Sequence, residues 1–273
     1  MFLELRTDVC YNEIGDAMKI LKMKKLKSGK YQIKLSNMET LTTYDDVILK
    51  YNLLFDKEIT SELLKDLYAQ TKYYDIYYKV VKYLSVRMRS TYEIHKYLKK
   101  YQVLEEEEDK LIRELQGKGL LNDALFAKAY ASDKMHLSNF GPDKIRSDLK
   151  ALHIDESFIE DALGELEQSD IEETLDKIIQ KKWNTNRRYS EYQWKEKVLL
   201  ELVQKGYPRS MVQEHLEHFS CDDYAMIEKE YERQKKKLGK KYQGKDLIYQ
   251  IKGKLYQKGY TSEDINRVLE EDE

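Results

Sequence analysis

The sequence predicts an all-α protein of tandem three-helix repeats, in an elongated curved array, with a small N-terminal module that contains a β-hairpin. Three observations predict it. The chain of 273 residues is 36% charged and has only 2 prolines and 11 glycines, so helix breakers are scarce. Lys205-Gly206-Tyr207 recurs 53 positions later as Lys258-Gly259-Tyr260. Apolar residues recur in the same register, as an internal duplication requires.

Four apolar columns share this register. An earlier copy also aligns, at an offset of 51, because Ile94 and Leu98 then match Ile145 and Leu149. Units of about 50 residues are near the lower limit for a self-sufficient core, so neighbouring units are expected to stack. The columns are Ile145, Val198 and Ile251; Leu149, Leu202 and Leu255; Ile159, Val212 and Ile265; Leu163, Leu216 and Leu269.

The N-terminal module does not repeat. Two alternating stretches, residues 19–24 and 30–35, flank Lys27-Ser28-Gly29 and predict a hairpin, followed by short helices over residues 45–51 and 61–68. The sequence leaves open whether residues 1–17 are ordered. The predicted divisions are residues 1–68 for the module, then 69–121 (repeat 1), 122–169 (repeat 2), 170–220 (repeat 3) and 221–273 (repeat 4).

Start and stop signals divide repeat 3 into three helices. Ser169 with Glu172 has the spacing of a capping box before the first helix. After a break at residues 184–188, Ser190 with Gln193 opens the second helix. Pro208 is placed near the start of the third, because its fixed φ suits a helix N-terminus.

The sequence predicts a residue with positive φ in the turn that ends each middle helix. Gly206 and Gly259 occupy this column in repeats 3 and 4, and His153 occupies it in repeat 2. Glycine adopts the left-handed conformation without steric cost, and histidine is among the types that tolerate it. His153 is therefore interpreted as a turn residue, not a ligand.

Several functional classes are not expected. No apolar run approaches the roughly 18 residues of a membrane span, and the acidic N-terminus does not resemble a signal peptide, so a cytoplasmic protein is predicted. Cys10 and Cys221 provide no disulfide framework. The net charge of −2 gives no overall attraction to DNA, although basic residues cluster locally at residues 22–30 and 233–245.

Motifs that suggest catalysis or cofactors are also rejected. The stretch from Gly239 to Asp246 is one residue short of a phosphate-binding loop and has no preceding strand, so a helix–helix loop is preferred. His215, His218 and Cys221 fall at spacings of three, but no second element supplies further ligands for a metal. The sequence predicts no catalytic residue, metal or cofactor.

A family resemblance lies between residues 85 and 154. Arg87-Met88-Arg89-Ser90, followed by Ile94 and Leu98, resembles the arginine–serine opening of a RecX repeat. Gly119-Leu120-Leu121-Asn122-Asp123, with Phe126 and Ala127, is similar to the glycine-to-aspartate turn and Phe-Ala pair of that family. The order and spacing of these motifs identify the chain as similar to RecX proteins over residues 70–273, with His153 departing from the usual glycine.

The resemblance implies a regulatory protein and not an enzyme. It implies binding to the RecA recombinase or its filament on single-stranded DNA, with inhibition of filament growth, ATP hydrolysis and strand exchange, in DNA repair by homologous recombination and the SOS response. A monomer with weak direct DNA contact at most is expected. Two alternatives stay open: a nucleic-acid-binding helical module that acts without RecA, and a generic helical interaction scaffold.

Basic columns in the repeat register are the candidate partner-binding residues. Lys134, Arg187 and Lys240 share the turn between first and second helices, so stacked repeats would form a basic stripe; ordinary solvation of surface turns is the alternative. Lys144 shares a column with Lys197. The full candidate set is Arg87, Arg89, Lys134, Lys144, Arg146, Arg187, Arg188, Lys197, Lys240 and Lys252.

Overall fold

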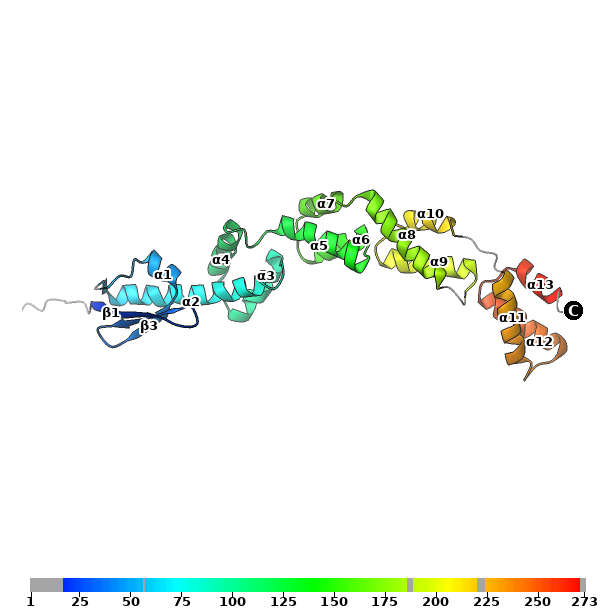
Figure 1. Ribbon diagram of the computed structural model, residues 1–273, viewed down its shortest axis with the longest axis horizontal. Helices are drawn as coiled ribbons and strands as arrows, with labels where there is room; N and C mark the ends of the chain where they lie inside the picture. The colour runs from blue at the N-terminus through cyan, green and yellow to red at the C-terminus, as the bar shows by residue number, and fades with distance from the viewer. Residues whose placement is uncertain (1–16, 56, 186–188, 220–223, 271–273) are drawn as a thin grey trace, which may run out of the picture. The chain divides into compact units, whose positions relative to one another are not determined.

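A computed structural model describes residues 17–55, 57–185, 189–219 and 224–270 (Figure 1). These residues form thirteen α-helices and a four-stranded sheet, which confirms the predicted mostly helical class with an N-terminal antiparallel module. The chain divides into two compact units, Met1–Leu121 and Asn122–Glu273.

The helices are α1 (Asp45–Lys50), α2 (Ser61–Leu84), α3 (Thr91–Leu98), α4 (Glu105–Gly117), α5 (Asp123–Ser138), α6 (Pro142–Ala151), α7 (Glu156–Gly164), α8 (Gln168–Asn184), α9 (Glu191–Gln204), α10 (Arg209–Glu217), α11 (Tyr224–Leu238), α12 (Gly244–Gln257) and α13 (Ser262–Glu270), with the 3-10 helix η1 (Lys99–Tyr101) after α3.

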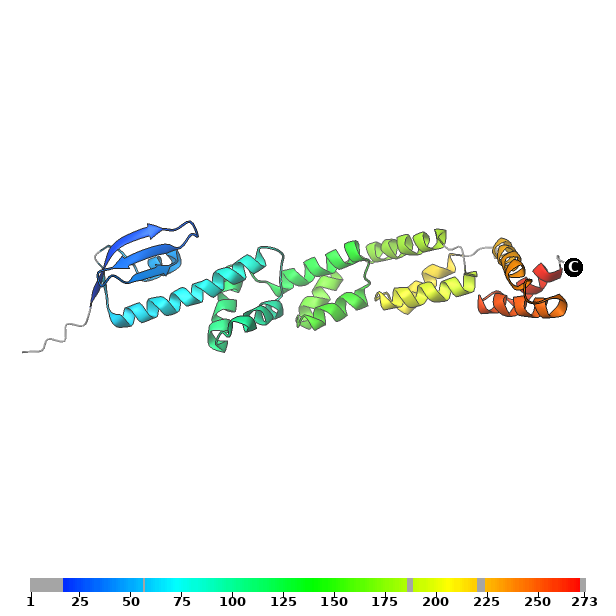
Figure 2. The ribbon, with the colours of Figure 1, turned by 90° about the horizontal axis from the view of Figure 1, so that it is seen from below.

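The predicted hairpin is present. Strand β1 (Met18–Lys25) pairs antiparallel with β2 (Tyr31–Leu35), and β3 (Thr40–Thr43) and β4 (Glu58–Ile59) extend the sheet to the order β3-β2-β1-β4. The sequence did not predict β3 and β4, because strands this short show little alternation. Figure 2 shows the sheet lying along α2. Side chains of the inner face of the sheet form one core with residues of α1 and α2.

Helix α2 is longer than predicted. The expected helix over residues 61–68 continues without a break to Leu84, so the predicted boundary after residue 68 falls inside α2. Leu64 and Leu67 at one end pack in the core of the sheet, whereas Ile76 and Val80 at the other end pack with residues of α3 and α4. One helix therefore serves both the N-terminal module and repeat 1, because its apolar stripe continues past the predicted boundary.

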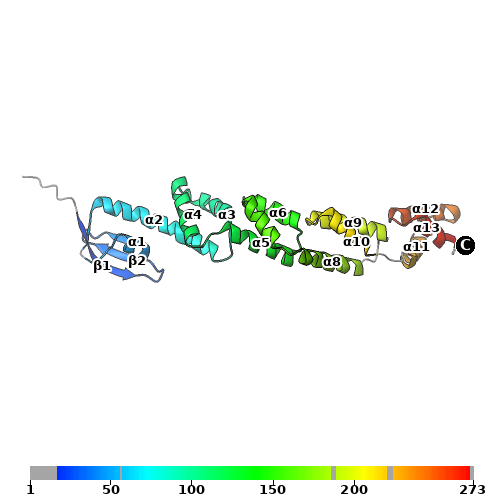
Figure 3. The ribbon, with the colours of Figure 1, turned by 90° about the horizontal axis from the view of Figure 1, so that it is seen from above.

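Repeats 2 and 3 share a single core in the second unit. Helices α5 to α7 form repeat 2 and α8 to α10 form repeat 3, and buried residues from all six helices belong to one cluster. Ile145, Leu149, Val198 and Leu202, from the predicted apolar columns, are buried in it. Helices α9 and α10 lie side by side (Figure 3). The three helices of repeat 4 have a smaller core of their own.

The predicted left-handed turns are confirmed. His153 has φ 56°, Gly206 has φ 88° and Gly259 has φ 82°, and Gln102, at the same position in repeat 1, has φ 51°. The turn conformation is thus a property of every repeat, including two in which a side chain must adopt it.

The predicted capping box at Ser169 is wrong. Helix α8 already begins at Gln168, with Glu167 as its N-cap, and the Ser169 hydroxyl lies 3.5 Å from a Glu167 carboxylate oxygen. Leu166 packs against the shared core of repeats 2 and 3 and so anchors the chain immediately before the helix. Tertiary packing therefore decides where α8 begins.

Candidate partner-binding surface

The junction between repeats 2 and 3 joins two helix ends. The backbone N–H of Gly141, the N-cap of α6, donates to the Lys205 carbonyl at 2.8 Å, and that of Asp143 donates to the Gly206 carbonyl at 3.0 Å. These N–H groups have no partner inside α6, as is general for the first turn of a helix. A Cβ on Gly206 would lie 2.2 Å from the backbone nitrogen of Lys144, so glycine is required by close approach as well as by φ.

Repeats 3 and 4 meet at the equivalent place. The Ser190 hydroxyl, at the N-cap of α9, donates to the Lys258 carbonyl at 2.9 Å, and the Gln193 amide donates to the Gln257 carbonyl at 2.5 Å. A Cβ on Gly259 would lie 2.4 Å from the Gln193 side chain. Lys258 and Lys205 occupy the same column, so the same carbonyl is used at both junctions.

The electrostatics of the junctions are favourable. In each, the N-terminus of one middle helix faces the C-terminal turn of the next, which brings the positive end of one helix dipole to the negative end of another. At the second junction the Lys258 ammonium also pairs with Glu230 of α11 at 2.8 Å. Burial acts to raise the pKa of Glu230, but hydrogen bonds from Gln234, Lys258 and Arg233 outweigh it and lower that pKa below its usual value.

The predicted arginines of repeat 1 are held by one carboxylate. Arg87 donates to Glu93 at 2.6 Å and Arg89 donates to the same oxygen at 3.1 Å. Arg89 also stacks over the Tyr83 ring, 4.1 Å from its centroid, and its side chain is only 13% exposed. Of the pair, Arg87 is the better placed to meet a partner, because its side chain is 52% exposed.

Ion pairs also engage two predicted cations of repeat 2. Lys144 pairs with Asp148, one turn along α6, at 2.7 Å. Arg146 pairs with Glu160 and, at 3.5 Å, with Glu156, both on α7. Both cations remain near the protein surface, where such pairs contribute little to stability and can exchange partners.

Three more of the predicted cations contact aromatic rings or a side-chain amide. The Lys197 ammonium lies 3.4 Å from the Tyr189 ring centroid, and Lys134 lies over the Tyr130 and Phe140 rings at 5.2 and 5.6 Å. Lys252 donates to the Asn266 side chain at 3.1 Å.

The remaining candidates differ in their surroundings. Lys240 is exposed and has no partner among the described residues. Arg187 and Arg188 lie outside the described residues. Every described candidate that has a partner finds it within its own repeat, so direct contact does not unite the basic columns. The junctions at Gly206 and Gly259 instead determine how far apart equivalent cations of neighbouring repeats lie.

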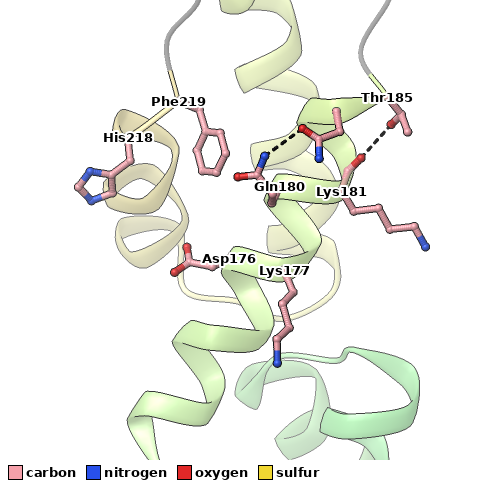
Figure 4. Close-up of a pocket in the computed structure, with 8 residues that line it drawn as sticks. Asp176, Lys177, Gln180, Lys181, Thr185, His218 and Phe219 are labelled. Atoms are coloured by element: carbon pink, nitrogen blue, oxygen red, sulfur yellow. Dashed lines mark hydrogen bonds between the residues drawn. The ribbon is translucent and has the colours of Figure 1, made fainter.

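A pocket of about 860 Å³ lies between α8 and the end of α10 in repeat 3. Figure 4 shows Phe219 pointing toward Gln180, while the Lys177 and Lys181 side chains extend away from that ring. Asp176, which lines the pocket, is hydrogen-bonded to the His215 ring at 2.6 Å. The pocket walls thus combine an aromatic ring with amide, ammonium, carboxylate and imidazole groups.

Metal-ligating side chains are dispersed in the described part of the chain. No three His, Cys, Asp or Glu residues in it are arranged to hold a metal ion. Cys221, from the rejected metal motif, lies outside the described residues. Burial raises the pKa of Tyr207 to about 12, so this phenol stays protonated and acts as a core residue. Within the same described ranges, no helix combines the length and apolar character of a membrane span.

The junction residues are the functional positions that the sequence analysis missed. Gly206 and Gly259 were identified as turn residues, but their role as contacts to the preceding repeat was not. Ser190 and Gln193 were identified only as a helix start. A partial signal was available in retrospect, since the glycine turn at Gly206 recurs 53 residues later at Gly259.

This architecture defines a class: a tandem three-helix repeat protein preceded by a small antiparallel sheet, with its cations on repeat surfaces. Models of the second and third three-helix domains of RecX match residues 122–163 and 170–216 of this chain. The regulatory protein RecX of Leuconostoc mesenteroides is 27% identical over 253 residues, which cover 90% of this chain and 93% of that protein. That of Streptococcus pyogenes serotype M4 is 28% identical over 257 residues, which cover 91% and 97%.

Solved structures also show similarity to RecX proteins. A crystal structure of regulatory protein RecX superposes with a TM-score of 0.62 at 26% identity, over 72% of this chain and 97% of that one. A crystal structure of RecX from Lactobacillus salivarius, 24% identical, has a TM-score of 0.50 over 54% and 95%, and supports the fold alone. Domain models, relatives over most of the chain and a solved structure thus all support the RecX family for this chain.

Proposed function

We propose that this protein binds the RecA recombinase, or its filament on single-stranded DNA, and inhibits filament growth, ATP hydrolysis and strand exchange without catalysing a reaction. The observation that carries the proposal is similarity to the regulatory protein RecX over 90% of the chain, together with repeats that are joined at two equivalent junctions. A filament is itself a repeating partner. Cations that recur from repeat to repeat in the sequence suit a partner whose acidic groups also recur.

The proposal includes the organisation of the chain. Residues 1–68, 69–121, 122–169, 170–220 and 221–273 act as an N-terminal module and four repeats, and α2 links the module to repeat 1. The protein acts as a monomer in the cytoplasm. The partner-binding residues are the ten cations named above, with Arg87 and Lys240 the most available among the described ones.

The direct test measures ATP hydrolysis by RecA that is already assembled on single-stranded DNA. Adding the purified protein in substoichiometric amounts should lower the steady-state rate progressively, because each bound molecule affects more than one RecA subunit. No change in rate, with a helical circular dichroism spectrum that demonstrates folding, would contradict the proposal and favour a helical scaffold.

A control separates inhibition from competition for DNA. If the protein only covered single-stranded DNA, inhibition would disappear when DNA is added in excess over RecA. Inhibition of a preassembled filament at saturating DNA is the outcome expected from binding to the filament.

A further inference from the structure

The outer face of the N-terminal sheet carries three lysines that are not among the proposed partner-binding residues. Lys22 and Lys24 lie on β1 and Lys34 lies on β2, and all three are exposed. The sheet register pairs Lys22 directly with Lys34, and Lys24 with Gln32. These three lysines, the lysine face, have no ion-pair or hydrogen-bond partner for their ammonium groups among the described residues.

The arrangement is unfavourable for the isolated protein. Like charges that face each other across an antiparallel pair destabilise the sheet, and side chains in such positions have Cβ atoms only about 5 Å apart. Lys22 and Lys24 are about 7 Å apart along their strand. Three ammonium groups are therefore concentrated in a small area of a protein whose net charge is −2. An anionic partner would relieve their repulsion.

The other charges of the sheet do not neutralise this face. Glu58 on β4 pairs with Lys19 at 3.8 Å, and Glu39 lies in the turn between β2 and β3. Lys30, at the end of the hairpin, is paired with Asp75 at 2.5 Å. The neighbouring outward side chains of Gln32, Thr40 and Thr42 are neutral hydrogen-bond donors.

Protection of an exposed sheet edge is the simplest alternative role for these lysines. Beyond Lys19, β1 has no partner on its β4 side, and edge strands commonly carry lysine to prevent aggregation. This role accounts for Lys22 and Lys24. It does not account for Lys34, because β2 is an interior strand with β1 on one side and β3 on the other.

We propose that the lysine face binds the sugar–phosphate backbone of single-stranded DNA. Ammonium groups contact phosphates as point charges, and amide and hydroxyl groups add hydrogen bonds that do not read sequence. A flexible single strand can follow a flat sheet and bring successive phosphates to all three lysines, whereas a rigid duplex would touch a flat face at fewer points. The outer face presents no aromatic ring for stacking, so the contact should be independent of base sequence. This binding to single-stranded DNA requires no recombinase, so it can be tested separately from the proposed function.

The test uses the full chain without RecA and a fluorescently labelled oligo-dT in an anisotropy titration over a series of salt concentrations. Wild type should bind at low salt and weaken as salt rises, because bound counterions are released. Substituting Gln at Lys22, Lys24 and Lys34 together should weaken binding about tenfold or more at low salt and reduce the slope of log affinity against log salt by about 2. The matched control substitutes Gln at Lys65, Lys72 and Lys82, which are exposed on α2, and should behave as wild type.

Three outcomes would overturn the assignment. They are an unchanged slope in the lysine-face variant, equal loss in the α2 control, and equal or tighter binding to a duplex of the same length. Displacement of the DNA by poly-glutamate at equal charge would also overturn it, since the face would then be an unselective polyanion surface. Folding is checked by Tm, which should not fall in the lysine-face variant because the substitution removes repulsion.

Discussion

The Ser190 hydroxyl and the Lys258 carbonyl are 2.9 Å apart and join repeat 3 to repeat 4. One repeat earlier, the Gly141 N–H meets the Lys205 carbonyl at 2.8 Å. In both cases the N-cap residue of a middle helix binds the carbonyl before the left-handed turn of the next repeat. The donor differs, a hydroxyl in one junction and a backbone amide in the other, but the geometry is retained. This contact is the structural unit of the array.

Substitution of Gly206 by Ala should destabilise the junction of repeats 2 and 3. The added Cβ meets Lys144 at 2.2 Å and the residue keeps φ 88°, so the expected loss is about 2 kcal/mol or more in the free energy of unfolding. Both tryptophans lie in repeat 3, so tryptophan fluorescence during urea denaturation reports this region. Gly164→Ala is the control, since nothing lies within 4 Å of its added Cβ. An equal loss in both variants would contradict the role of the junction.

Ser190→Ala should loosen the attachment of repeat 4. The variant loses both the cap of α9 and the bond to Lys258, which together should cost about 1–2 kcal/mol. Hydrogen exchange should become faster in residues 244–260. Thr60→Ala removes a cap from α2 without touching a junction, so exchange in residues 244–260 should not change. If Ser190→Ala also leaves it unchanged, the hydroxyl does not hold the repeats together.

Truncation of a leucine in an apolar column should cause a large loss in the free energy of unfolding. Leu149 and Leu202 are fully buried in the core shared by repeats 2 and 3, and replacing either by Ala should reduce the free energy of unfolding by about 2–5 kcal/mol. Leu200 lies two residues from Leu202 on the same helix but is 56% exposed, so Leu200→Ala should change stability by about 0.5 kcal/mol at most. Tryptophan fluorescence in urea distinguishes the two classes. A small effect of Leu202→Ala would show that the column is not a core.

Charge reversal at Lys134, Arg187 and Lys240 tests the basic stripe. Glu at all three positions should weaken binding to the RecA filament about tenfold or more, because each replaces an attractive contact by a repulsive one. Binding is measured by co-sedimentation with filaments, and far-UV circular dichroism should be unchanged. The control carries the same charge change at Lys96, Lys181 and Lys229, which are exposed elsewhere. Equal binding by both triple variants would refute the stripe.

Glu230 predicts a pH dependence of stability in repeat 4. Its pKa is lowered in the folded protein from the ordinary 4.5, because Gln234, Lys258 and Arg233 donate hydrogen bonds that outweigh burial. Its stabilising contribution is therefore complete above about pH 4.5 and is lost as the pH falls through the lower folded value. Wild type should be more stable than Glu230→Gln at pH 7, and the difference should shrink below pH 4.5. A difference that does not depend on pH would exclude the carboxylate charge as its cause.

Local patterns predicted much of the fold. The apolar columns that include Leu149 and Leu202 are buried, and the turn at His153 is left-handed even though it lacks glycine. These predictions succeeded because apolar periodicity identifies the buried face of a helix, and because a turn's conformation depends mainly on neighbouring residues. The extent of α2 and the start of α8 were predicted incorrectly, because contacts with distant residues determined them.

The sequence by itself determined the class of this protein, since the spacing of its apolar residues and turns specifies three-helix repeats without reference to anything distant. Only the tertiary structure decided how repeats join, which cations are already engaged, and that Lys22 lies opposite Lys34. Each of these features depends on a residue far along the chain. The Gly141 N–H donates to the Lys205 carbonyl, and Lys22 lies opposite Lys34 only because β1 pairs with β2. Periodicity reports which face of a helix or strand is buried, but not which distant group it meets.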